Sequence, residues 1–109
     1  MAFDEGLAER IRARLGTDPG ITQKRMFGGL AFLHEGNMAV GVIGDELMVR
    51  VGPDATEAAL ARPGTRPFDL TGRPMRGWVV VASSAVSEDE ALADWVDQGH
   101  AFAASLPPK

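Results

Sequence analysis

Four short apolar runs constrain the fold most strongly, because only brief turns separate them. They span residues 21–27, 30–33, 38–43 and 47–51. Parallel neighbours would need a crossover of a dozen or more residues, and no gap between these runs is that long. Residues 43–46 have the pattern of a two-residue hairpin, in which Gly44 supplies a positive φ. This region therefore predicts an antiparallel sheet built from consecutive hairpins.

A helix is predicted on each side of this sheet region. Apolar side chains recur every four residues from Phe3 to Leu15, which predicts an amphipathic helix with Asp4 as N-cap and Gly16 at its end. Near the other end of the chain, Ser87 and Glu90 match a capping box. The helix that follows carries one apolar stripe, formed by Leu92, Trp95, Val96, Phe102, Ala103 and Leu106.

The middle of the chain predicts a short helix and two more strands. Pro53 precedes Asp54 and Glu57, whose spacing matches a capping pair, and Pro63 ends this helix. Residues 67–70 and 75–81 flank a predicted hairpin turn at residues 71–74. The order is helix, three or four strands, short helix, two strands, helix. It predicts an α+β fold, an antiparallel sheet with helices mainly on one face, as one domain over residues 1–109.

Composition narrows the class of protein. The 109 residues include no cysteine, which excludes disulfides, thiol nucleophiles and cysteine metal sites and favours a cytoplasmic location. No apolar run reaches the ~18 residues of a membrane span, and the first residues lack a signal-length apolar core. The net charge of −4 argues against wholesale binding of nucleic acid, so DNA is the less favoured partner.

The pair Gly28-Gly29, after Lys24 and Arg25, raises the question of a phosphate loop. Such a loop needs backbone N–H groups converging at a helix N-terminus, with a lysine after the last glycine. Here the basic residues come first and residues 30–33 predict a strand. The pattern favours a bulge or bend in the backbone. Binding of a nucleotide or another small molecule by Lys24, Arg25, Gly28 and Gly29 is the alternative.

No catalytic constellation and no cofactor or metal site is predicted. His34 has one acidic neighbour in a turn, and His100 lies late in the last helix, so each is interpreted as a surface or capping residue. The paired carboxylates Asp45-Glu46 and the acids 88–90 belong to a turn and to a helix's first turn. We therefore expect a protein that is not an enzyme.

The hairpin over residues 66–78 is the best candidate for a binding site. Between residues 62 and 76 there are four arginines and one acid, whereas residues 87–106 contain five acids and no Lys or Arg. Arginine beside an aromatic ring such as Trp78 can bind phosphate, stack on bases or engage an acidic partner. The alternative is that the arginines solvate a sheet edge and Trp78 is core. The candidate binding residues are Arg66, Arg73 and Arg76.

Three stretches in order, "KRMFGGLAF", "GDELMVRVGP" and "TGRPMRGWV", resemble the N-terminal domain of the TfoX/Sxy competence regulators. The resemblance covers nearly the whole chain, whereas full-length regulators carry a second, helical domain. It implies an α-β(3)-α-β(2)-α fold of the secretion-chaperone-like type, with no attributed phosphate site. It also implies a setting in transcriptional regulation of competence. We therefore expect a non-enzymatic module that binds another protein, and a homodimer is left open.

Overall fold

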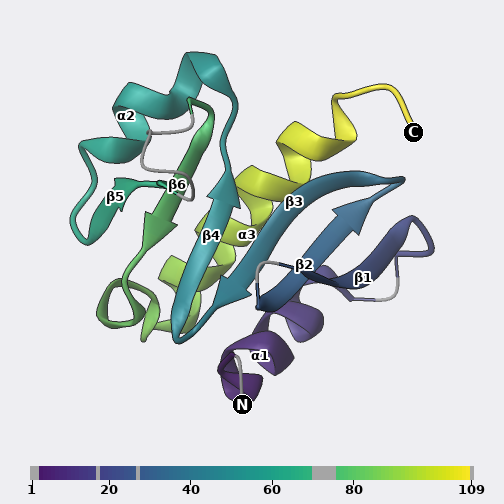
Figure 1. Ribbon diagram of the computed structural model, residues 1–109, viewed down its shortest axis with the longest axis horizontal. Helices are drawn as coiled ribbons and strands as arrows, with labels where there is room; N and C mark the ends of the chain where they lie inside the picture. The colour runs from purple at the N-terminus through teal and green to yellow at the C-terminus, as the bar shows by residue number, and fades with distance from the viewer. Residues whose placement is uncertain (1–2, 17, 27, 70–75, 109) are drawn as a thin grey trace.

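The computed structural model describes residues 3–16, 18–26, 28–69 and 76–108 of the chain. Among these residues, six strands form one sheet. They are β1 (Ile21–Met26), β2 (Gly29–His34), β3 (Asn37–Ile43), β4 (Glu46–Arg50), β5 (Thr65–Pro67) and β6 (Trp78–Val81). Their order across the sheet is β1-β2-β3-β4-β6-β5 and all neighbours are antiparallel (Figure 1). The predicted antiparallel sheet is confirmed, with four strands before the middle helix.

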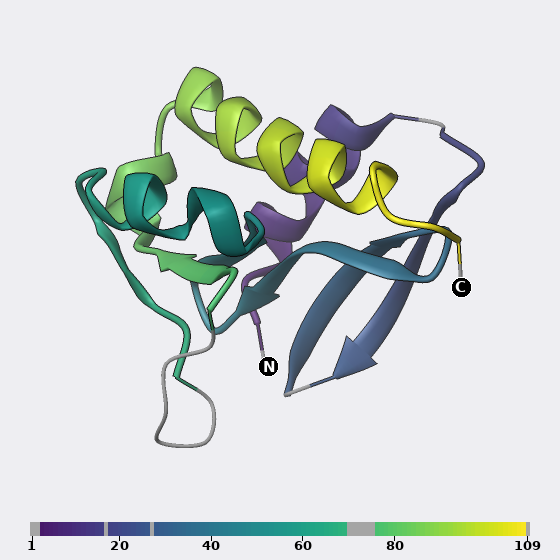
Figure 2. The ribbon, with the colours of Figure 1, turned by 90° about the horizontal axis from the view of Figure 1, so that it is seen from above.

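Helices α1 (Glu5–Leu15), α2 (Thr56–Leu60) and α3 (Asp89–Ala104) lie on one face of the sheet, as Figure 2 shows. Short 3₁₀ turns, Pro53–Ala55 and Ser83–Val86, precede α2 and α3. Strand alternation explains the layering, because every second strand residue points toward the helices. Leu47, Val49, Val79 and Val81 are fully buried there.

The first helix forms as the sequence predicts. The Asp4 carboxylate accepts hydrogen bonds from the backbone N–H of Gly6 (2.9 Å) and Leu7 (3.2 Å), which are otherwise unpaired donors of the first turn. Gly16 ends the helix at a φ of 69°, a conformation that glycine adopts without strain. The apolar face formed by Leu7, Ala8, Ile11 and Leu15 is buried.

The last helix packs unusually close to the sheet. Its buried face includes Leu92, Trp95 and Val96, which confirms the centre of the predicted stripe. A Cβ at Gly99 would lie 2.5 Å from the carbonyl oxygen of Ala39 on β3, so this approach needs glycine. The contact fixes the C-terminal half of α3 against the sheet.

Two capping predictions are wrong. A 3₁₀ turn precedes each helix, and the residue predicted as N-cap belongs to that turn or directly follows it. Before α3, the N-cap is Glu88, with no side-chain capping bond, and the Ser87 hydroxyl donates to the carbonyl of Ser84. Before α2, the N-cap is Ala55, not Asp54, and likewise has no side-chain capping bond. The Thr56 hydroxyl donates back to Gly52 there.

The strand predicted at residues 67–70 lies earlier, because β5 spans Thr65–Pro67. Phe68 follows it as a buried residue at 5% exposure. The predicted turn at residues 71–74 lies outside the described residues. Among the described residues, no helix is long and apolar enough to cross a membrane.

Candidate functional site

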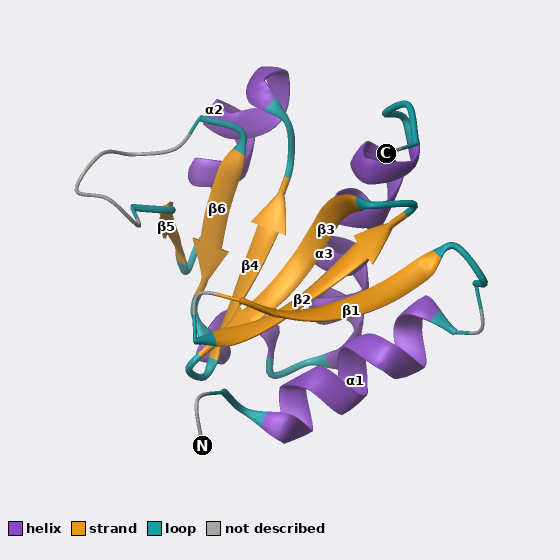
Figure 3. Ribbon diagram, turned by 45° about the vertical axis from the view of Figure 1, so that its right-hand side comes forward, coloured by secondary structure: helices purple, strands orange, loops and turns teal. Residues whose placement is uncertain are grey.

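Within the described part of the chain, no helix crosses the second face of the sheet (Figure 3). We call it the helix-free face. Its centre is apolar and comprises Ala31, Met38, Met48, Phe68 and Val80, with Met26, Leu33, Ile43 and Trp78 half-buried around them. These residues alternate along the strands with the helix-side core, as Met48 does between Leu47 and Val49.

The centre of the helix-free face is closely packed. Met48 lies opposite Gly41 on β3, and a Cβ at Gly41 would be 2.8 Å from the Met48 methyl carbon. The missing side chain therefore makes room for Met48, which is 1% exposed. The centre of the cluster is therefore buried, and the apolar residues on this face that keep partial exposure are those around it, Met26, Leu33, Ile43 and Trp78.

Arg66, a predicted binding residue, is already paired. Its side chain lies on β5 opposite Val80, and its guanidinium forms a two-pronged ion pair with the Glu46 carboxylate, one bond measuring 2.6 Å. This hydrogen bonding lowers the pKa of Glu46 and raises the pKa of Arg66. The pair links the edge strand β5 to β4 across β6, which gives Arg66 a structural role.

Arg50, which the sequence analysis did not select, also lies on this side of the sheet. Its guanidinium carbon lies 5.4 Å from the ring centroid of Trp78 on β6 and 5.4 Å from that of Phe102 on α3. Pairing between β3 and β4 ends at Val40–Val49, and Figure 1 shows these strands diverging beyond that point with α3 behind the gap. Strand alternation could have indicated Arg50, because it shares the face of Met48.

Two further basic residues lie next to this face. Arg76 is exposed two residues before the start of β6, and Lys24 is exposed on β1 opposite Ala31. Arg73 lies outside the described residues. The structure thus combines an apolar centre with basic side chains at its border, and the Glu46 carboxylate on this face is paired with Arg66.

The glycine pair is part of a β-hairpin. Met26 pairs with Gly29, so Gly28, at φ 73°, lies in the connection between β1 and β2, and a strand follows it. A Cβ at Gly29 would lie 2.1 Å from the carbonyl oxygen of Val42. Arg25 points to the helix side, where its guanidinium carbon is 5.7 Å from the Phe3 ring centroid, whereas Lys24 faces the other way. The two cations do not converge on the glycines, so the geometry does not favour a phosphate loop.

The acids considered for catalysis occupy structural positions. Glu46 is bound to Arg66, and Asp89 in the first turn of α3 pairs with Arg10 at 3.1 Å. The two histidines, each interpreted from the sequence as a surface or capping residue, lie together with ring centroids 5.2 Å apart. Sequence spacing gave no signal for this proximity.

The fold defines a small α+β domain whose described helices all lie on one face of the sheet. A family model of the TfoX N-terminal domain matches residues 13–103. The chain therefore belongs to the TfoX N-terminal domain family, a competence-related family that is not known for enzymes. No curated protein and no solved structure shows significant similarity to it.

Proposed function

We propose that this domain is a non-enzymatic module that binds another protein through the helix-free face. The observation that carries the proposal is an apolar cluster, centred on Met48 and Val80, on a sheet face that no described helix covers. Membership of the TfoX N-terminal domain family supports a setting in transcriptional or competence regulation, in the bacterial cytoplasm.

The border residues indicate the chemistry of the partner. Arg76 and Lys24 are exposed. The negative charge of Glu46 on β4 is neutralised by its ion pair with Arg66 on β5. An acidic segment would complement these charges and speed association. Trp78 and Arg50 belong to the residue types that contribute most at protein interfaces, and methionine adapts to a partner's shape. We therefore propose an acidic protein segment with apolar side chains as the ligand.

Duplex DNA fits less well. The chain carries a net charge of −4, and α3 includes four acids, Asp89, Glu90, Asp94 and Asp97, but no Lys or Arg. A protein that binds DNA tightly neutralises many phosphates and shows a steep dependence on salt. The few basic groups at the border of the helix-free face favour a protein partner.

Capture of partners from the source cells tests the proposal with three immobilised proteins. The wild type is compared with Lys24→Ala/Arg76→Ala at the border and with Arg12→Ala/Arg14→Ala on α1, which removes the same charge from the helix layer. The proposal is supported if an acidic protein binds the wild type and the α1 variant with similar affinity. Its affinity for the border variant should be at least about tenfold lower, a difference of about 1.4 kcal/mol in binding free energy. Equal capture by all three, or preferential binding of duplex DNA across a salt series, would contradict it.

A further inference from the structure

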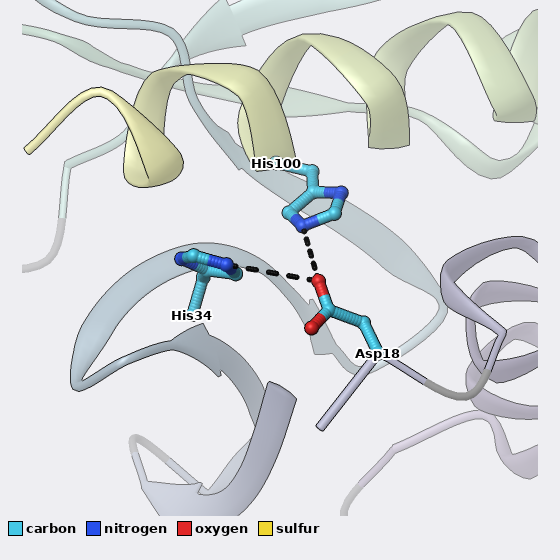
Figure 4. A group of neighbouring side chains, drawn as sticks. All are labelled: Asp18, His34 and His100. Carbon is cyan, nitrogen blue, oxygen red and sulfur yellow. Dashed lines mark ion pairs between the residues drawn. The ribbon is translucent and has the colours of Figure 1, made fainter. Parts of the chain in front are cut away.

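Three potential metal ligands from distant parts of the chain meet beside the end of the sheet. Figure 4 shows Asp18 from the connection between α1 and β1, His34 from the end of β2, and His100 from α3. One carboxylate oxygen, Oδ2 of Asp18, lies 3.2 Å from Nε2 of His100 and 3.6 Å from Nε2 of His34. One ligand atom from each residue lies within 4.8 Å of the other two.

We propose that Asp18, His34 and His100 bind a first-row divalent transition metal ion, with Zn²⁺ as the best fit. Two imidazole nitrogens and one carboxylate oxygen form a donor set that suits this class of ion. Ligands held at ~2.0–2.1 Å around a tetrahedral ion lie roughly 3.3 Å from one another. The two separations from Asp18, 3.2 and 3.6 Å, match that spacing. The ligand nitrogens of the two histidines lie within 4.8 Å of each other, so binding the ion would draw the two imidazoles together.

The backbone around the cluster fixes the ligands in place. The Gly20 N–H donates to Oδ1 of Asp18 (2.8 Å), which orients the carboxylate and leaves Oδ2 directed at the histidines. This hydrogen bond lowers the pKa of Asp18. The Gly20 carbonyl accepts from the N–H of Glu35 (2.8 Å) and thereby ties the loop to the end of β2. Such outer hydrogen bonds are the usual support of a metal ligand.

Two glycines bring the ligands close enough. A Cβ at Gly20 would lie 3.2 Å from Nε2 of His34, and Gly99 permits the close contact of α3 with β3 that brings His100 near. The ligand side chains retain 31, 17 and 29% exposure for Asp18, His34 and His100. The site is thus accessible to an ion from solvent and leaves room for a water molecule as a further ligand. A bound ion would connect the loop, the sheet and α3.

Calorimetric titration of the tag-free protein with ZnCl₂ tests the site, with MgCl₂ as the control for general attraction of cations. We expect Asp18→Asn, His34→Gln and His100→Gln each to weaken Zn²⁺ binding at least about tenfold. Glu35→Gln is the matched control, because it removes a neighbouring carboxylate that is outside the cluster. Equal weakening by Glu35→Gln and Asp18→Asn, or equal affinity for Zn²⁺ and Mg²⁺, would overturn the assignment.

A measurement on the wild type alone makes the test independent of how well the variants fold. The chain contains two histidines, so two sets of ring ¹⁵N signals report on the cluster directly. Zn²⁺ should shift both sets at one equivalent and should raise the melting temperature, because a ligand that binds only the folded state stabilises it. Ring signals that stay unchanged while Zn²⁺ binds elsewhere would refute the site.

Discussion

Replacement of Trp95 by alanine should cause a large loss of stability. Trp95 is 2% exposed in the helix-side core, and the Arg62 guanidinium carbon lies 3.7 Å from its ring centroid. Arg62 is held there by Asp94, at 3.2 Å. Truncation of a buried tryptophan costs about 3–5 kcal/mol, and loss of the cation–π contact adds about 0.5–1 kcal/mol. Since the free energy of unfolding of a small domain is about 5–15 kcal/mol, this loss would leave the variant close to unfolding.

Urea denaturation followed by far-UV circular dichroism measures this cost without relying on tryptophan fluorescence. In a thermal melt followed by the same signal, the melting temperature should fall by at least about 12 °C, because each kcal/mol of lost stability lowers it by about 4–8 °C in a domain of this size. Trp78→Ala is the matched control, since Trp78 is half-buried on the helix-free face and should cost less. A loss below about 1 kcal/mol for Trp95→Ala would refute the assignment of the helix-side core.

Two further predictions concern the hairpin glycines and the ion pair on β5. Gly29→Val should lower the free energy of unfolding by about 1–3 kcal/mol or more in urea denaturation, because its Cβ would collide with the Val42 carbonyl. Gly28→Ala meets open space, so its loss of about 1–2 kcal/mol should come mainly from the positive φ that alanine must adopt there. Wild-type stability of both variants would contradict this. The pKa of Glu46 is lowered in the folded state, so its stabilisation is present above its ordinary value of 4.5 and is lost as pH falls through the lowered value. Glu46→Gln should therefore flatten the loss of stability on acidification by up to about 1 kcal/mol, and an unchanged pH profile would count against the ion pair with Arg66.

Much of the architecture could be predicted because it depends on local patterns. The hairpin turn at residues 43–46, the N-cap at Asp4 and the buried stripe around Trp95 follow from residue type and spacing. The helix starts at Ser87 and Asp54 were wrong because the same residues can cap a helix or extend a 3₁₀ turn, and the chain before the helix decides between them.

The candidate sites were less predictable because they depend on contacts between distant segments. Arg66 could be selected by its charge, but its pairing with Glu46 depends on β5 lying beside β6 and β4. The meeting of Asp18, His34 and His100 likewise requires the close approach of α3 to the sheet at Gly99. Neither contact could be predicted from the spacing of residues in the sequence.

Methyl NMR tests the central claim, that the helix-free face binds a protein partner, most directly. Met26, Met48 and Ile43 report on that face, and Ile11 reports on the helix-side core. The acidic protein captured from the source cells is titrated into protein labelled at methionine and isoleucine methyl groups. The account predicts that the Met26, Met48 and Ile43 signals shift while the Ile11 signal stays in place. Shifts confined to Ile11, with the three signals of the helix-free face unchanged, would contradict it.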